Sequence, residues 1–287
     1  MIALSSVDQL VCAVRNAREV TFGAYVLHPG RLMSALEDAA RAGVRLHVRA
    51  EAQPYRNGGG GQANAAAVAR LRALGADAIV VDGLHFKGAV VDRALFLDDR
   101  NWADRGDTIL RDDDPRDVGL ARDAVSGRPV ASTDRLAVRK VDALALEARV
   151  LADASANADI EVETESFSFG PQLYETVAHL AKLGRHVRLL VDRRDLAGNP
   201  RERVALTDLA RDGVQIRNCA STEKFAVAGR RAWVGSANAT YGVPTQRDWG
   251  IRTESHAIVD HLRTTFEANW GKGAPVLRQA GHDTMCQ

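Results

Sequence analysis

HFKGAVVD, residues 85–92, is the stretch that decides the fold. It places His85, Lys87 and Asp92 at the spacing His-x-Lys-x-x-x-x-Asp, and Asn101 follows at a short distance. From average residue usage, this three-residue pattern would occur by chance in a chain of this length about one time in a hundred. The residues GAVVD are rich in β-branched side chains, so we expect the motif to lead into a buried strand.

A second, altered copy of this stretch follows later in the chain. It contains TEKFAVAG from Thr222, and then the element Gly-Ser-Ala-Asn that ends at Asn238 and includes Ser236. The two copies align without a gap, and the position of Asp92 is then taken by Gly229. The matched pairs of functional type are His85 with Thr222, Lys87 with Lys224, and Asn101 with Asn238.

The secondary-structure pattern repeats together with the motif. Apolar spacing predicts helix, strand, helix, strand, helix, strand, strand once before residue 110 and again from residue 139. Such alternation is typical of α/β folds, and duplicated halves tend to pair about a twofold axis. We therefore expect two pseudo-twofold-related α/β/α halves, each a mixed sheet flanked by helices, at residues 1–125 and 126–287. A single irregular α/β domain is the alternative, and the matched motifs argue against it.

The composition excludes several other classes of protein. The net charge of +1 provides no global basic field for nucleic acid, and three scattered cysteines do not form a disulfide framework. The N-terminal stretch carries Asp8 and Arg15 within its apolar residues, so we expect no secretion signal there, and no run of eighteen apolar residues occurs. We expect a cytoplasmic protein without a transmembrane segment, a monomer whose two halves form an internal pseudo-dimer. The charged segment 112–138 is read as the connection between the halves.

Lysine usage points to the same two motif positions. The chain contains five lysines against thirty-three arginines, and two of the five are Lys87 and Lys224. A site that needs a compact ammonium group instead of a planar guanidinium would explain this exception.

On these motifs, the chain resembles the phospholipase D superfamily over about residues 5–110 and 142–270. The resemblance implies metal-independent phosphodiester chemistry without a cofactor, in which a histidine attacks phosphorus and becomes a phosphohistidine. It implies that two lysines and two asparagines hold the phosphate oxygens. The implied catalytic residues are His85, Lys87, Asn101, Asp107, Lys224 and Asn238.

The remaining implied roles concern support and substrate contact. Asp107 would fix the tautomer of His85, and Asp92 would brace the motif loop as a structural residue. The residues expected near the substrate are Ser236, Thr222, His28, Asp248 and Trp102.

The second motif departs from the family pattern. Thr222 stands where a second histidine is expected, and threonine is no general acid near neutral pH. The first copy departs as well, because Asp98 and Asp99 stand where the family has its first Gly-Ser, next to an anion site. Either the leaving group needs no acid, or another residue supplies the proton, or the site binds phosphate without turnover. His28 is the first candidate for the proton donor, and Glu223 is the weaker one.

Two functions therefore stay open at this stage. The first is a phosphodiesterase or phosphotransferase acting on a nucleic acid, a phospholipid headgroup or a small metabolite. The second is a catalytically impaired relative that binds a phosphate-containing ligand or nucleic acid without turnover.

Overall fold

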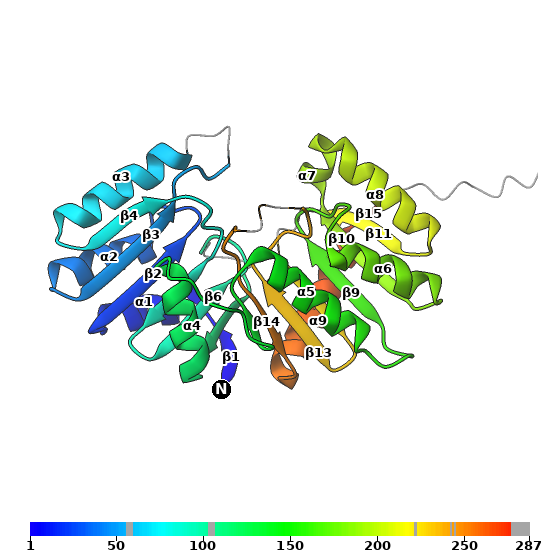
Figure 1. Ribbon diagram of the computed structural model, residues 1–287, viewed down its shortest axis with the longest axis horizontal. Helices are drawn as coiled ribbons and strands as arrows, with labels where there is room; N and C mark the ends of the chain where they lie inside the picture. Colours follow the sequence, from blue (N-terminus) through cyan, green and yellow to red (C-terminus); the bar gives the residue numbers. More distant parts are fainter. Residues whose placement is uncertain (56–59, 103–106, 221–222, 242, 244, 277–287) are drawn as a thin grey trace, which may run out of the picture.

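The computed structural model describes residues 1–55, 60–102, 107–220, 223–241, 243 and 245–276. In this part of the chain, two mixed β-sheets lie side by side, and helices surround them (Figure 1). No helix within these ranges combines the length and the apolar character needed to cross a membrane. The predicted two-half α/β architecture is confirmed.

The first half contains a seven-stranded sheet of order β1-β7-β6-β5-β2-β3-β4. Strands β2, β3 and β4 are parallel, and the others pair antiparallel. Its elements are β1 (Ile2–Ser5), α1 (Val7–Arg15), β2 (Glu19–Ala24), α2 (Arg31–Arg41), β3 (Arg45–Glu51), α3 (Gly60–Ala73), β4 (Asp77–Val81), β5 (Gly88–Val91), β6 (Ala94–Asp98), β7 (Ile109–Asp112) and α4 (Pro115–Val125).

The second half repeats this plan with the order β8-β14-β13-β12-β9-β10-β11-β15. Only the short helix α7 and the edge strand β15 have no counterpart among the described elements of the first half. Its elements are β8 (Leu136–Ala137), α5 (Lys140–Ala152), β9 (Ile160–Thr164), α6 (Gln172–Lys182), β10 (Val187–Asp192), α7 (Arg193–Gly198), α8 (Pro200–Arg211), β11 (Gln215–Cys219), β12 (Phe225–Ala228), β13 (Arg231–Gly235), β14 (Gly250–Thr253), α9 (His256–Lys272) and β15 (Ala274–Pro275).

Three apolar clusters hold these layers together. One packs the first sheet against α1, α2 and α3, and another packs the second sheet against α5, α6 and α8. The third lies between the two sheets, where α4 and α9 also contribute, and it joins Phe86 and Leu97 to Phe225 and Trp249. Because this cluster shares its side chains between the halves, the two motif regions are held at a fixed distance.

The segment 112–138, which connects the two halves, contains regular secondary structure. It contains helix α4, which the side chain of Asp114 caps by accepting a hydrogen bond from the backbone N–H of Arg116, with Pro115 at the first helical position. Helix α4 packs on β5 as its counterpart α9 packs on β12. The segment thus joins the halves through a helix that begins at an Asp-Pro pair within a charged stretch.

Strand directions bring both motifs to the same edge of the molecule. Strand β5 is antiparallel to β2, with Gly88 opposite Gly23, and β12 is antiparallel to β9, with Phe225 opposite Glu163. The residues just before β5 and β12 therefore lie beside the residues that follow β2 and β9.

Candidate active site

His85 lies in the loop before β5, where the two halves exchange backbone hydrogen bonds. Its backbone N–H donates to the carbonyl oxygen of Arg247 at 2.8 Å, and the N–H of Arg247 donates to the carbonyl oxygen of Gly83 at 2.8 Å. The carboxylate of Glu51, at the end of β3, accepts from the N–H of Leu84 at 2.6 Å. The motif loop is therefore fixed both by its own sheet and by the second half.

This pairing brings Asp248 of the second half to the histidine ring. Nδ1 of His85 donates to Oδ1 of Asp248 at 2.6 Å. The carboxylate is fully buried and also accepts from Oγ of Ser236 at 2.8 Å and from Nε2 of Gln246 at 2.9 Å. Burial would raise the pKa of Asp248, but His85 and nearby Lys140 outweigh it and lower that pKa. A carboxylate at Nδ1 keeps the proton there, so Nε2 carries the lone pair.

Lys87 lies over the same imidazole. Its Nζ is 2.9 Å from Nε2 of His85, and only 1% of the residue is exposed. Burial and then the charge of Lys87 lower the pKa of His85 to about 4. Burial, followed by the charge of Lys224, lowers the pKa of Lys87 to about 7. At neutral pH the imidazole is therefore neutral and able to act as a nucleophile.

Lys224 enters the site from the second half. Its Nζ is 3.2 Å from Oε2 of Glu165, and its backbone N–H donates to Oδ2 of Asp99 at 3.1 Å. Burial would raise the pKa of Glu165, but Lys224 and Lys87 outweigh it and lower that pKa to about 2. The sequence reading did not single out Glu165, which follows β9 in an ordinary strand pattern.

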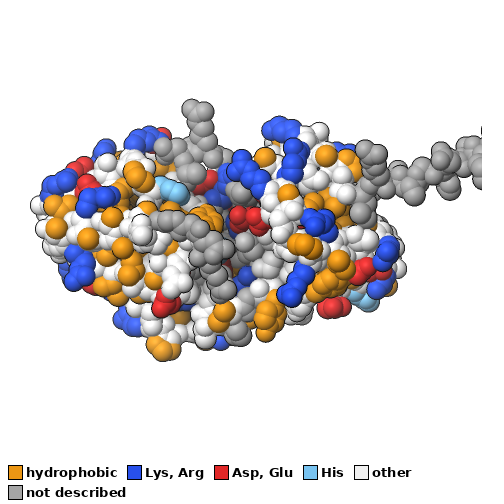
Figure 2. Space-filling model, turned by 90° about the horizontal axis from the view of Figure 1, so that it is seen from above, with side chains coloured by type: hydrophobic (Ala, Val, Ile, Leu, Met, Phe, Trp, Pro, Cys, Tyr) orange, Lys and Arg blue, Asp and Glu red, His pale blue; other side chains and the backbone are white. Residues whose placement is uncertain are grey.

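The cavity beside His85 has a volume of about 690 Å³ and is lined by both halves. It includes Tyr25, whose ring lies edge-on to the imidazole at 4.6 Å between centroids, and Asn238. The side-chain oxygen of Asn238 is buried without a hydrogen-bond partner among the described residues. Figure 2 shows this face from above, with basic and acidic side chains gathered where the two lobes meet.

The matched motifs therefore meet in one place. Residues 151–270 match the family model described as cardiolipin synthase, phospholipase D-like domain. Over these residues the chain is similar to a phospholipase D-like domain.

Two solved structures extend the phospholipase D-like fold over nearly the whole chain. The polyphosphate kinase of Porphyromonas gingivalis is 14% identical with a TM-score of 0.66, over 99% of this chain and 53% of that one. The chain thus spans about half the length of that kinase. The phosphatidylserine synthase of Haemophilus influenzae Rd KW20 is 12% identical with a TM-score of 0.66, over 96% of this chain and 87% of that one. A search of curated protein sequences found no match.

Within this phospholipase D-like frame, Asp107 does not occupy the predicted place. Its carboxylate pairs with Arg100 at 3.3 Å, and Asp248 makes the contact to His85. Asp107 precedes Thr108 as Asp248 precedes Trp249, and the N–H groups of both following residues donate to the matched pair Asp99 and Ser236. Asp248 therefore serves the motif of the other half, a crossing that sequence order does not reveal. Thr222, the residue Asp107 would serve, lies outside the described residues.

The two acidic residues that replace Gly-Ser are accommodated by the backbone. Asp98 accepts from the N–H of Trp102, and Asp99 accepts from the N–H groups of Thr108 and Lys224. Burial, reinforced by neighbouring carboxylates, raises the pKa of both well above the ordinary value. Their carboxylates thus stabilise the loop after β6 through backbone N–H groups, away from the expected phosphate site.

Ser236 and Asp92 also have supporting positions. Ser236 is buried, and its hydroxyl donates to Asp248 while accepting from the N–H of Trp249, so it holds the aspartate and does not face the cavity. Asp92 lies at the far end of β5, where its carboxylate accepts from the N–H groups of Arg18 and Glu19 at 3.0 Å each. Asp92 is structural but does not brace the motif loop, which Glu51 holds.

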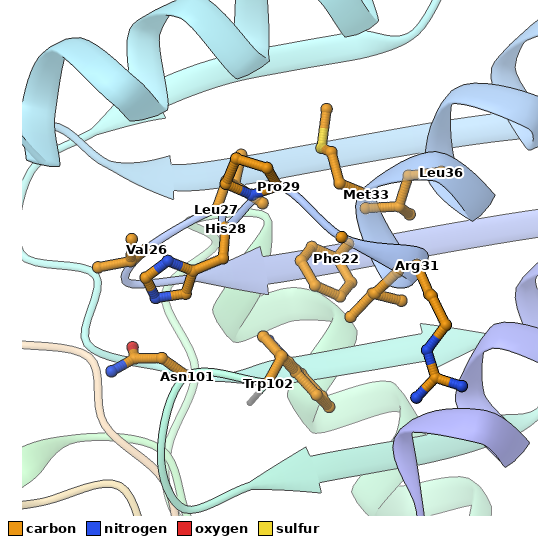
Figure 3. A pocket seen from close by; sticks show the side chains of 12 residues that line it. Phe22, Val26, Leu27, His28, Pro29, Arg31, Met33, Leu36, Asn101 and Trp102 are labelled. Carbon is orange, nitrogen blue, oxygen red and sulfur yellow. The ribbon is translucent and has the colours of Figure 1, made fainter. Parts of the chain in front are cut away.

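Asn101, His28 and Trp102 meet at a smaller pocket of about 300 Å³ (Figure 3). Asn101 donates to the hydroxyl of Tyr55 at 3.2 Å, and its own side-chain oxygen is buried without a partner in the described part of the chain. The exposed ring of His28 is turned toward Asn101 in Figure 3. Trp102 is buried against Phe22 at 5.4 Å between ring centroids, so it forms the pocket wall.

Lys140 is a site residue that the motifs did not indicate. It begins α5, is 5% exposed and lines the 690 Å³ cavity, and its Nζ donates to Oγ1 of Thr240 at 3.1 Å. Burial lowers its pKa. Three of the five lysines in the chain are thus buried around one site. The low number of lysines in the sequence therefore indicates Lys140 as a site residue as well. In the described ranges, no cluster of three or more His, Cys, Asp or Glu side chains is arranged to hold a metal ion.

Proposed function

We propose that this protein is a metal-independent phosphodiesterase or phosphotransferase in which His85 is the nucleophile. The observation that carries the proposal is the state of this imidazole: Nδ1 is held by Asp248 at 2.6 Å, and Nε2 lies 2.9 Å from the ammonium group of Lys87. A neutral ring with a fixed tautomer is what nucleophilic attack requires.

The first step uses the charges around that ring. A phosphodiester in the cavity draws the ammonium groups of Lys87 and Lys224 onto its non-bridging oxygens, while Asn101 and Asn238 donate amide hydrogens. Nε2 of His85 then attacks phosphorus, and the bond to the leaving oxygen breaks with its electron pair on that oxygen. Asp248 stabilises the positive charge that develops on the imidazole. The lysines supply the cationic charge that other phosphoryl-transfer sites obtain from a divalent ion.

The second step releases the phosphoryl group to water or to another acceptor. The chain has no histidine at Thr222 to assist either step, so substrates with weakly basic leaving groups are favoured. Nucleic acids, phospholipid headgroups and small metabolites all contain the phosphodiester group that this site would recognise.

Turnover of bis(p-nitrophenyl) phosphate tests the proposal. The wild-type protein should release p-nitrophenolate, and His85→Asn should lower kcat by at least about 10³-fold, because the asparagine keeps a polar group but forms no covalent intermediate. Asn16, which bonds to the carbonyl oxygen of Cys12 on α1, offers a control site, and Asn16→Asp should leave kcat unchanged. Equal turnover by His85→Asn would exclude this mechanism. If a phosphodiester binds but is never cleaved, the alternative of a binding protein without turnover is correct.

A further inference from the structure

Glu165 holds the same place in the second half that Tyr25 holds in the first. The motif lysines directly precede Gly88 and Phe225, which pair with Gly23 and Glu163. Two residues further along each strand stand Tyr25 and Glu165. Tyr25 lies against the imidazole of His85 in the first motif. Glu165 takes the corresponding place beside Lys224 of the second motif.

The surroundings of Glu165 combine burial with access to the cleft. Its side chain is 24% exposed, and Oε2 lies 3.2 Å from Nζ of Lys224. The charges of His85 and Lys87 in the other half also act on this carboxylate. The titratable groups that interact with it are Lys224, Lys87, His85, Tyr25, Tyr55, Asp195 and Glu202.

The other candidates for proton transfer fit less well. Glu223 is 7% exposed and accepts from the hydroxyl of Thr108, which turns it toward the loop after β6. His28 lies on the exposed rim of the smaller pocket beside Asn101. Glu165 combines a direct contact to a motif lysine with partial exposure.

We propose that Glu165 is the general base that activates water for hydrolysis of the phosphohistidine, in place of the absent second histidine. This inference rests on the proposed function of His85. The oxygen of water attacks phosphorus, its proton passes to the carboxylate of Glu165, and the bond between phosphorus and Nε2 breaks with the electron pair returning to the imidazole. The proton then leaves to solvent with the product.

Phosphate binding prepares the carboxylate for this role. In the free site, Lys224 and Lys87 lower the pKa of Glu165 to about 2, against the effect of burial. When these ammonium groups turn to the phosphate oxygens, the pKa of Glu165 rises, and a more basic carboxylate takes a proton from water more readily. Glu165 is ionised before substrate binds, so it serves the second step and gives no proton to the first leaving group.

Rapid-quench kinetics with bis(p-nitrophenyl) phosphate separate the two steps. Glu165→Gln should keep the burst of p-nitrophenolate within a few-fold of wild type, because this leaving group needs no proton. Steady-state turnover should fall by about 10²–10⁴-fold, and the phosphorylated protein should accumulate. Asp195→Asn removes a nearby charge whose carboxylate accepts from the hydroxyl of Ser166, and it should leave both phases nearly unchanged.

A chemical rescue provides the second measurement. In Glu165→Ala, added formate should restore part of the steady-state rate, because a small carboxylate can occupy the vacated space. The wild-type rate of dephosphorylation should decline at acidic pH as Glu165 is protonated, and this decline should be absent in Glu165→Gln. Steady-state turnover of Glu165→Gln equal to or faster than wild type would overturn the inference, since the carboxylate would then only compete for Lys224. Absence of any adduct in the wild type would instead contradict the role of His85.

Discussion

The first half retains the whole pattern His-x-Lys-x-x-x-x-Asp, which the second half keeps only in part, although the two share strand order and helix placement. The second half nevertheless supplies Asp248, Ser236 and Lys224 to the site. The second half therefore completes the motif of the first, and the absence of one histidine leaves His85 with these partners in place.

The duplication extends to interactions far from the chemistry. Arg122 of α4 donates to the carbonyl oxygen of Asp92, and Arg263 of α9 donates to that of Gly229. Asp92 and Gly229 both have a positive φ, +53° and +61°. The turn thus has the same shape in both halves, and glycine adopts it without the carboxylate contacts that Asp92 makes.

The crossed aspartates provide the largest test of this comparison. Asp248→Asn should lower kcat by about 10²–10⁴-fold, because an amide no longer fixes the proton on Nδ1 of His85. Asp107→Asn, the matched change in the first half, should have a far smaller effect, since Asp107 pairs with Arg100. Steady-state kinetics of the two variants decide the matter, and a reversed order of effects would mean that the aspartates are not crossed.

The pH dependence of kcat/KM tests the electrostatics of the first motif. His85 becomes neutral as the pH rises through its lowered pKa of about 4, whereas Lys87 loses its charge as the pH rises through about 7. The value of kcat/KM should therefore be bell-shaped, with its maximum between these values and a roughly tenfold loss per pH unit beyond either limb. An acidic limb near 6.5, the ordinary value for histidine, would show that the imidazole is not held as described.

The smallest expected effect concerns the two turns. Asp92→Gly converts the first turn to the form found in the second and removes two hydrogen bonds to backbone N–H groups. We expect a loss of about 1 kcal/mol in the free energy of unfolding, measured by urea denaturation. Asp92→Asn retains the acceptor and should lose less. Activity should be unchanged in both, because Asp92 and His85 lie beyond opposite ends of β5; a large loss of activity would indicate a direct role in the site.

Most of the fold and part of the site could be predicted from the spacing of residues along the sequence. The pattern His-x-Lys and the Gly-Ser-x-Asn element are contiguous, so His85, Lys87 and Lys224 could be found without a structure. The crossing of Asp107 and Asp248 depends on how the two halves dock, which no local pattern records. Glu165 stands in a strand where a single glutamate looks ordinary, and only the pairing of β9 with β12 reveals it as the counterpart of Tyr25.

The most direct test of the central claim is mass spectrometry of the protein quenched during turnover of bis(p-nitrophenyl) phosphate. The account predicts one phosphoryl adduct per chain, on the peptide that contains His85, and none in His85→Asn. An adduct on any other residue, or turnover in which no adduct on His85 ever forms, would contradict it.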